Sequence, residues 1–322
     1  MTNILIFGGG GMVGQKLAAL LSDNPLSSGA RVTLCDLHFP DNGAPVAEQI
    51  TGTVTNPAVL KRLAATRPDI VYYLVAIVSG EAEQDFNLGW QVNMAAFQSF
   101  VDTFRNEVNA SEGDYKPKII FTSSIAVFGA PFPEKIGDAF FHAPQTSYGA
   151  QKAMSELLLT DHIRKGFFDG VSIRLPTICV RPGKANKAAS SFFSGIIREP
   201  LNGVEAILPV DPQTRHWHAS PRSAAGFLRH AATLEQSAYE NRPALNMPGV
   251  SCTVAEQIQA LWDMCGAEVA ARIHHQPDAQ IEAIVKNWPR NFDPARAKAL
   301  GFTAEQSFNE IIQVYLDDDF TG

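Results

Sequence analysis

The sequence predicts an α/β fold in which a doubly wound parallel sheet is accompanied by a smaller C-terminal α+β domain. Three observations lead to this prediction. The chain opens with an apolar strand, a glycine-rich turn and a helical stretch within residues 3–22. Strand-sized apolar runs then alternate with helical patterns as far as residue 175, which is typical of repeated βαβ units. With 322 residues, 45% of them hydrophobic, the chain can bury two lobes.

Short apolar segments predict the strands, and the stretches between them predict the helices. Most of these strands are continuous apolar runs, which indicates burial on both faces of a parallel sheet. The expected strands are residues 3–7, 30–35, 46–54, 70–76, 118–123, 170–175 and 244–247. The expected helices are residues 15–22, 57–65, 84–108 and 148–165.

The order of these elements also predicts how two domains divide the chain. Residues 1–182 hold the first six strands and form a Rossmann domain. A segment near residues 222–250 returns to this domain with the last strand. Residues 183–221 and 251–322 are expected to form the substrate domain.

A glycine-rich turn links the first strand to the first helix. Gly8, Gly11 and Gly14 recur at a spacing of three, with Met12 and Val13 between the last two. Glycine permits a tight turn and lets the backbone approach a pyrophosphate, which the N–H groups and dipole of a helix N-terminus attract. The turn therefore predicts a dinucleotide site, although a flexible surface turn could have the same composition.

An acidic residue at the end of the second strand indicates which dinucleotide binds. Asp36 lies 22 residues after Gly14. At this place a carboxylate can hold the ribose hydroxyls of NAD, and it repels the 2′-phosphate of NADP. We therefore expect NAD, unless a basic residue elsewhere compensates for the phosphate charge.

Tyr148 and Lys152 lie one helical turn apart in the expected helix 148–165, and Ser124 follows the expected strand 118–123. Residues four apart share a helix face, so the Lys152 ammonium can favour the phenolate of Tyr148 and lower its pKa. A tyrosine with a lowered pKa can take a proton from an alcohol. The pair predicts alcohol chemistry, whereas on its own it also fits a solvated helix face.

Composition and charge exclude several other classes of function. The net charge of −7 provides no basic field for nucleic acid or for an anionic membrane. The longest apolar run, residues 70–78, has only the length of a strand, and the first residues do not form a signal peptide, so we expect a cytoplasmic protein. The four cysteines form no CxxC pair. His216 and His218 share a strand face without a carboxylate or cysteine partner, so no metal site is predicted.

Together these motifs resemble the extended short-chain dehydrogenase/reductase family, and the resemblance spans nearly the whole chain. It rests on the glycine turn, Asp36, Asn93, the strand ending at Ser124 and the Tyr148/Lys152 pair. The resemblance implies that NAD is bound and that a homodimer forms through residues 84–108 and 148–165.

The resemblance also implies a role for each site residue. Ser124 would hold the reacting oxygen, Tyr148 would act as the base, and Lys152 would lower the Tyr148 pKa and bond the nicotinamide ribose. Further contacts with NAD are expected from Leu74, Ala76, Asn93, Thr122, Pro176 and Thr177.

The segment after the sixth strand departs from members of the family that act on nucleotide sugars. It lacks their Asn-Val-Tyr-Gly-Pro-like sequence and is rich in cations and hydroxyls. Arginine can bind a carboxylate through two parallel hydrogen bonds, so Arg181 and Arg215 are expected to bind a small acid, with Lys187 as a further cation. Each of these cations also fits a solvated surface. The segment resembles members that oxidise the C2 hydroxyl of a four-carbon sugar acid with NAD.

Two other functions stay open on the sequence. A nucleotide-sugar epimerase or dehydratase would use the same Ser124, Tyr148 and Lys152 but would retain its NAD through the cycle. A non-catalytic Rossmann module that senses the cofactor would commonly lack these three residues.

Overall fold

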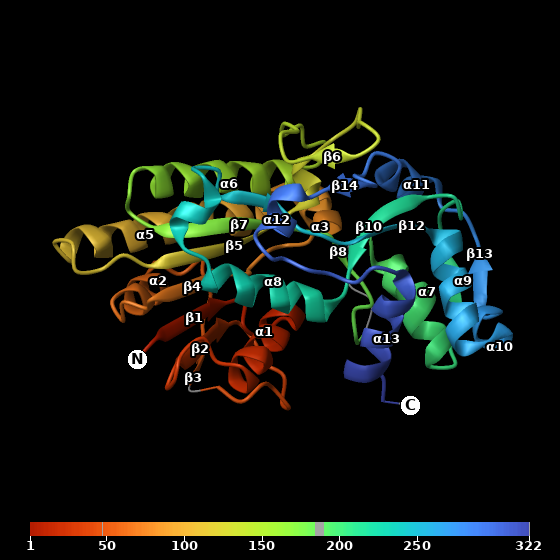
Figure 1. Cartoon of the computed structure of the whole chain (residues 1–322), viewed down its shortest axis with the longest axis horizontal. Helices are drawn as coiled ribbons and strands as arrows, with labels where there is room; N and C mark the ends of the chain where they lie inside the picture. The colour runs from red at the N-terminus through yellow and green to blue at the C-terminus, as the bar shows by residue number, and fades with distance from the viewer. Residues whose placement is uncertain (47, 184–189, 322) are drawn as a thin grey trace.

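The computed structural model describes residues 1–46, 48–183 and 190–321, and its larger lobe is built on a seven-stranded parallel sheet (Figure 1). The strands are β1 (Asn3–Phe7), β2 (Arg31–Asp36), β3 (Glu48–Thr51), β4 (Ile70–Tyr73), β5 (Lys118–Ser124), β7 (Asp169–Leu175) and β11 (Ala244–Asn246). Their order across the sheet is β11-β7-β5-β4-β1-β2-β3. The predicted doubly wound α/β fold is confirmed. At the edge, β3 is shorter than the expected strand 46–54 and largely exposed.

Five helices cover the two faces of this sheet: α1 (Met12–Asp23), α2 (Pro57–Ala64), α5 (Ala96–Ala110), α6 (Ser147–Arg164) and α8 (Pro221–Thr233). Leu17 of α1 and Phe227 of α8 share one core with residues of the sheet. Phe97 and Phe100 of α5 belong to the core on the other face, together with residues of α2 and α6. Because both faces are covered, β1, β4 and β5 consist mostly of buried residues.

The expected helix 84–108 is present as one continuous helical run, which contains a π-helical turn. The run consists of α4 (Phe86–Gly89), the π-helical turn η1 (Trp90–Ala95) and α5, and the short helix α3 (Ser79–Gln84) precedes it. Asp85 ends α3 and caps α4, because its side chain accepts a hydrogen bond from the Leu88 backbone N–H. The π-helical turn contains Asn93, whose side chain is buried.

A smaller lobe lies beside the sheet and has a core of its own (Figure 1). Its strands are β8 (Thr177–Ile178), β9 (Ala206–Leu208), β10 (Arg215–Ala219), β12 (Val250–Thr253) and β13 (Ile273–His275). Its helices are α7 (Ser191–Leu201), α9 (Val254–Cys265), α10 (Ala267–Ala270), α11 (Ala279–Val285) and α13 (Phe308–Asp318). The strands form a three-stranded sheet, β12-β10-β8, and a pair, β13-β9.

Part of the C-terminal tail returns to the larger lobe. The strand β14 (Phe292–Asp293) pairs with β6 (Ile136–Gly137), and α12 (Ala295–Ala299) follows it. Ala297 and Phe302 belong to the core that α1 and α8 form against the sheet. The expected division therefore differs from the packing, because a stretch of the tail 251–322 belongs to the larger lobe. Two short 3-10 turns, η2 (Ile125–Val127) and η3 (Gln236–Tyr239), complete the elements.

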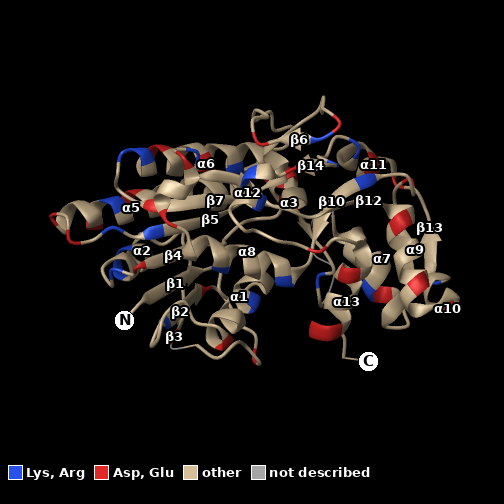
Figure 2. Ribbon diagram, in the orientation of Figure 1, with Lys and Arg blue, Asp and Glu red and all other residues tan. Residues whose placement is uncertain are grey.

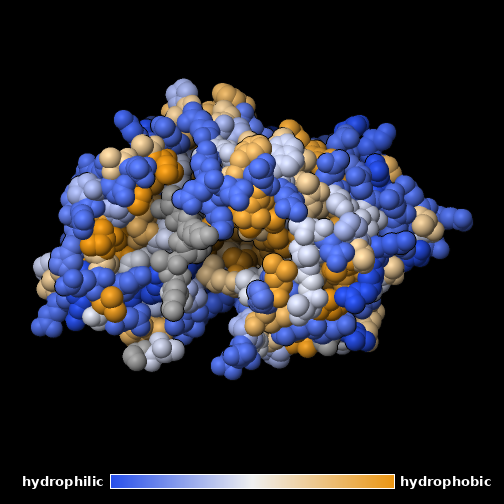
Figure 3. Space-filling model, turned by 180° about the vertical axis from the view of Figure 1, so that it is seen from behind, coloured by the Kyte–Doolittle hydropathy of each residue, from blue (hydrophilic) through white to orange (hydrophobic). Residues whose placement is uncertain are grey.

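Charged residues lie mainly on the outer helices and loops of both lobes, and the large sheet carries few of them (Figure 2). Both signs are interspersed on this surface. Seen from behind, the molecule is hollowed between the lobes, and hydrophobic side chains gather around the hollow (Figure 3). Within the described ranges, no helix combines the length and apolar character that crossing a membrane requires.

Candidate active site

A cavity of about 790 Å³ lies between the two lobes. Its wall contains most of the residues that the sequence predicts for cofactor binding and catalysis, most of them from the larger lobe, whereas Thr177 begins β8 of the smaller lobe. These are Gly8, Gly11, Met12, Val13, Gly14, Leu74, Ala76, Thr122, Ser124, Tyr148, Lys152, Pro176 and Thr177.

At Gly8 and Gly14 the glycine turn passes so close to its neighbours that a side chain would collide with the backbone. A Cβ on Gly8, whose φ is +83°, would lie 3.0 Å from the backbone of Leu74, and a Cβ on Gly14 would lie 2.3 Å from the Gly8 carbonyl oxygen. No side chain caps the N-terminus of α1, which begins after Gly11. This bare turn and helix N-terminus can receive a pyrophosphate.

Asp36 lies beside the turn at the end of β2. Its Oδ2 accepts a hydrogen bond from the Gly10 N–H at 2.9 Å, and its Oδ1 accepts one from the Leu37 N–H at 2.7 Å. The Asp36 carboxylate is not part of the cavity wall, but its hydrogen bond with Gly10 holds the glycine turn, which lines the cavity. A carboxylate oxygen has two lone pairs, so both oxygens can still accept a bond from a ribose hydroxyl.

The three predicted catalytic residues come together at the end of β5 and the start of α6. Ser124 closes β5, and Thr146 caps α6 so that Tyr148 and Lys152 enter the cavity from its first turns. The Lys152 Nζ donates to the Thr122 carbonyl at 2.8 Å and lies 5.8 Å from the centre of the Tyr148 ring. Both residues therefore have their side chains fixed by the strand that carries Ser124.

The pKa values of the pair differ from the sequence-based expectation. Burial raises the pKa of Tyr148 to about 12, and its hydrogen bond with Ser124 only partly opposes this shift. Burial also lowers the pKa of Lys152 to about 7, against the opposing charge of Glu156. The predicted lowering of the Tyr148 pKa by Lys152 is not found in the structure, because desolvation raises this pKa and the opposing contribution comes from Ser124.

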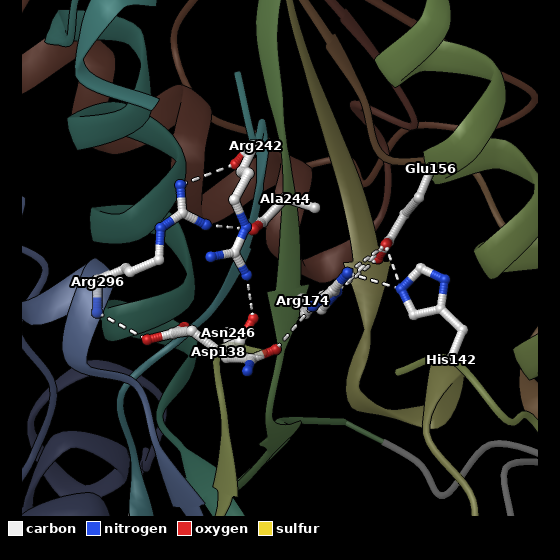
Figure 4. Close-up of polar contacts among 8 residues, drawn as sticks. All are labelled: Asp138, His142, Glu156, Arg174, Arg242, Ala244, Asn246 and Arg296. Carbon is white, nitrogen blue, oxygen red and sulfur yellow. Dashed lines mark hydrogen bonds and ion pairs between the residues drawn. The ribbon is translucent and has the colours of Figure 1, made fainter. Parts of the chain in front are cut away.

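A buried network lies one turn further along α6 (Figure 4). The Glu156 carboxylate accepts hydrogen bonds from Arg174 of β7, with Nη2 at 2.8 Å, and faces the His142 Nε2 at 3.1 Å. Arg174 also donates to Asn246 of β11 at 3.1 Å. Burial would raise the pKa of Glu156, but the charges and hydrogen bonds of Arg174 and His142 lower it to about 2. The Glu156 carboxylate is therefore ionised at neutral pH, and it lies one helical turn after Lys152 on α6.

A second group of contacts in Figure 4 ties the returning tail to the same end of the sheet. The Arg296 backbone N–H donates to the Asp138 carboxylate at 2.8 Å, and its guanidinium donates to the carbonyls of Arg242 at 3.0 Å and Ala244 at 3.4 Å. These bonds fix α12 against the strand β11 that carries Asn246.

Asn93 does not line the cavity, in contrast to its predicted place among the cofactor contacts. Its Oδ1 accepts from the Ile77 N–H at 2.8 Å, and its Nδ2 donates to the Ile77 carbonyl at 3.1 Å and to Gln151 at 2.8 Å. It is a positioning residue that holds the loop after β4, where Ala76 and Val78 line the cavity. Because η1 packs against α6, the Asn93 side chain is buried between them and faces neither solvent nor the cavity.

The cavity wall in the smaller lobe contains two arginines and the start of α7. Arg181 Nη2 donates to Ser190 Oγ at 3.1 Å, and the buried Arg198 donates to the Arg181 carbonyl at 2.7 Å. Desolvation lowers the pKa of Arg181. Ser190 and Ser191 begin α7 on the cavity wall. Positive charge, hydroxyls and a helix N-terminus together suit a carboxylate.

The structure does not bring Arg215 to the cavity. Arg215 Nη1 donates to the Ser251 carbonyl at 3.0 Å, and Nη2 pairs with the Glu256 carboxylate at 3.2 Å. Side chains alternate along β10, so Arg215 and Trp217 point away from the face that His216 presents to the cavity. The expectation that Arg215 binds the substrate disagrees with this placement. Lys187 lies outside the described residues.

Several residues of the cavity wall carry no local sequence motif. They come from β10 and from the segment around and after α11: His216, Ala283, Ile284, Asn287, Trp288 and Pro289. The segment is remote in sequence from every motif discussed above, and only Trp288 offers an aromatic signal. Across the described part of the chain, no group of three or more possible ligands could hold a metal.

Comparisons with known proteins identify the family of this chain. A model of the NAD-dependent epimerase/dehydratase family matches residues 4–220. D-erythronate dehydrogenase of Cupriavidus necator is 44% identical, with 98% of each chain covered. D-erythronate dehydrogenase of Haemophilus influenzae is 39% identical over 98% of this chain and 99% of the relative.

A crystal structure described as a nucleoside-diphosphate-sugar epimerase from Agrobacterium tumefaciens is 48% identical. It superposes with a TM-score of 0.92 over 98% of this chain and 94% of the other. The chain belongs to the NAD-dependent epimerase/dehydratase family. The family resemblance predicted from the sequence is therefore confirmed.

Proposed function

We propose that the chain is an NAD-dependent dehydrogenase that oxidises the C2 hydroxyl of D-erythronate, giving 2-dehydro-D-erythronate and NADH. The observation that carries the proposal is one cavity that holds the glycine turn, Ser124, Tyr148, Lys152 and Arg181. The two relatives that are 44% and 39% identical and carry this activity in their names support the choice of substrate.

The glycine turn fits the pyrophosphate of NAD because added side chains would collide with the backbone there. Gly8, Gly11, Met12, Val13 and Gly14 would hold the pyrophosphate. The contacts proposed for the nicotinamide end are Leu74, Ala76, Thr122 and the backbone of Pro176 and Thr177. When bound, NAD supplies the acceptor for the hydride that leaves C2.

The ribose near the adenine is assigned to Asp36. Its carboxylate lies beside the turn and would accept bonds from the two ribose hydroxyls, while its charge would repel a 2′-phosphate. This supports NAD rather than NADP.

Ser124 and Tyr148 would hold the C2 oxygen of the substrate between their hydroxyls. Tyr148, in its phenolate form, would take the proton of that hydroxyl and become a neutral phenol, while the hydrogen on C2 would leave as hydride. Because burial raises the pKa of Tyr148, formation of the phenolate depends on nearby positive charge, which Lys152 would supply when its amine is protonated, 5.8 Å from the ring centre. Lys152 would also bond the nicotinamide ribose.

The substrate carboxylate is assigned to Arg181 in the smaller lobe. Its guanidinium bonds Ser190 at the start of α7, so the helix N-terminus adds to the attraction for an anion. Lys187 stays a proposed further contact. Fixing the carboxylate on one side and the C2 oxygen on the other orients C2 for hydride transfer.

The test is an assay of the purified protein with NAD and a panel of four-carbon sugar acids. Absorbance of NADH is expected with D-erythronate. The absence of NADH across the whole panel would reject the proposed reaction.

A second function is favoured by the name of the Agrobacterium tumefaciens structure, which is 48% identical. A nucleotide-sugar epimerase or dehydratase would retain NAD and release no net NADH. Conversion of a UDP-sugar by the same preparation, detected by chromatography, would favour this alternative over the dehydrogenase.

We also propose a homodimer in the cytoplasm. Phe86, Trp90 and Leu157 lie on the segments 84–108 and 148–165 and are 56%, 43% and 62% exposed, which suits burial against a second copy. The four cysteines are free thiols, as in a reducing compartment. Light scattering after size-exclusion chromatography should give twice the chain mass, and Leu157→Glu should shift it to the monomer.

A further inference from the structure

Thr177 and His216 form a hydrogen-bonded pair on the wall of the cavity. Thr177 Oγ1 and His216 Nε2 are 2.6 Å apart, and both residues line the cavity. Thr177 begins β8, and it pairs with His218 of the parallel strand β10. His216 lies two positions before His218 and therefore on the same face of β10. The register of the two strands thus builds the pair into the fold.

The pair lies within reach of a small substrate held at the catalytic residues. Ser124 pairs with Leu175 across β5 and β7, and Thr177 follows two residues later. At about 3.3 Å per residue, Thr177 is about 7 Å further along the chain than the residue beside Ser124. A four-carbon acid with its C2 oxygen at Ser124 can direct its distal carbons toward this position.

The imidazole of His216 is held by aromatic neighbours. Its ring is stacked on Phe193, with centroids 5.1 Å apart and planes inclined by 5°. Trp288 lies 5.3 Å away, and His218 meets the ring edge-on at 5.3 Å. Rotation of the ring would break these contacts, so Nε2 stays directed at Thr177.

The pair is neutral at physiological pH, because burial lowers the pKa of His216 to about 3. A hydroxyl has one donor and two acceptor positions, and the bond to His216 occupies one of them. Whichever partner donates, Thr177 keeps at least one lone pair for a hydroxyl donor. A carboxylate gains no opposite charge here, whereas Arg181 and Arg198 line the same cavity.

We infer that Thr177 binds a hydroxyl group of the substrate beyond C2 and that His216 is the positioning residue that holds the Thr177 hydroxyl. The site would thereby select polyhydroxy acids over 2-hydroxy acids with a bare carbon chain. This inference rests on the proposed function and names the part of the substrate that the smaller lobe recognises.

The experiment compares two acids that differ only in their distal hydroxyls. The kcat/KM is measured for D-erythronate and for 2-hydroxybutanoate with the same configuration at C2, and the ratio of the two values is followed. T177V and H216F are expected to lower this ratio about 10-fold or more, since T177V removes the hydrogen bond that only D-erythronate uses and H216F removes the bond that orients the Thr177 hydroxyl for it. T177S keeps the hydroxyl and should restore most of the ratio.

His218→Phe is the matched control. His218 lies on the same strand face and also packs against Phe193, but its Nε2 contacts Gln257 at 2.8 Å and it is not part of the cavity wall. H218F removes an imidazole from the same core but leaves the side-chain bond between Thr177 and His216 in place, so the ratio should stay as in the wild type. If 2-hydroxybutanoate is turned over too slowly to measure, its inhibition constant against D-erythronate takes the place of kcat/KM.

Equal losses for both acids in T177V and H216F would overturn the inference, because a merely structural role affects both substrates alike. A fall of the ratio in H218F as large as that in H216F would remove His216 from the positioning role. If T177V does not fold, the ratios of T177A and H216F decide in its place. Failure of the wild type to produce NADH from either acid would instead reject the proposed function, and with it this inference.

Discussion

The two halves of the active-site cavity are built in different ways. The half in the larger lobe consists of the glycine turn, the end of β5 and the start of α6, and each of these carries a short sequence motif. The half in the smaller lobe is assembled from β8, α7, β10 and the segment after α11, which are far apart in the sequence. The reaction is thus encoded locally, whereas recognition of the substrate depends on how distant segments pack.

The first prediction concerns a substitution in the part of the cavity that the larger lobe forms. Tyr148→Phe removes the oxygen that, as phenolate, is proposed to accept the substrate proton, and we expect kcat to fall about 10³-fold or more, within the range for general bases. The ring remains, so binding of NADH, measured by its fluorescence, should be kept.

Substantial activity in Y148F would contradict the assignment of the base. S124A is the companion variant, because it removes only one of two groups around the C2 oxygen. It should lower kcat less than Y148F does.

The second prediction concerns the buried network behind Lys152. Arg174→Met leaves Glu156 buried without its main partner, and we expect a loss of about 3–5 kcal/mol in the free energy of unfolding. Urea denaturation of the wild type and R174M at neutral pH measures this difference.

The pH dependence of that difference tests its cause. The folded protein holds the pKa of Glu156 near about 2, below its ordinary value of 4.5. A lowered carboxyl pKa contributes stability above pH 4.5 that is lost as the pH falls toward about 2. The gap between the wild type and R174M should therefore narrow as the pH falls below 4.5. A gap that is constant with pH would show that Arg174 acts through packing alone.

The contrast between the two halves also explains how far the sequence could predict the structure. Gly8, Gly14, Tyr148 and Lys152 could be placed because their chemistry requires a fixed spacing of a few residues. The parallel sheet could be predicted because strands covered on both faces must be continuously apolar. These constraints act within one element or between neighbours.

What could not be predicted depends on tertiary packing. His216 and Trp288 are 5.3 Å apart at their ring centres, and nothing near either residue in the sequence indicates the other. The apolar pattern of residues 84–108 predicts one helix, and it indicates neither that Asp85 caps α4 nor that a π-helical turn follows. The buried position of Asn93 follows from that turn.

The third prediction concerns a substitution in the part of the cavity that the smaller lobe forms. Arg181→Met removes a charge-assisted bond to the substrate carboxylate, and we expect KM for D-erythronate to rise about 10- to 100-fold. The affinity for NADH should change little, because the glycine turn lies in the other half. An equal loss of NADH affinity would mean that Arg181 supports the cavity as a whole.

The last and smallest effect is expected at Arg215, which a motif-based interpretation places with Arg181. Because side chains alternate along β10, His216 faces the cavity and Arg215 points to the other side of the strand. There Arg215 forms an ion pair with Glu256 at 3.2 Å, and both side chains are well exposed. Such an exposed ion pair contributes at most about 1 kcal/mol to the free energy of unfolding. Without Arg215, the Glu256 carboxylate still accepts the capping bond from the Thr253 N–H at the start of α9. Arg215→Met should therefore leave KM for D-erythronate within about 2-fold of the wild type. A rise comparable to that in R181M would place the substrate on the opposite face of β10, and the division of the cavity into two halves would have to be redrawn.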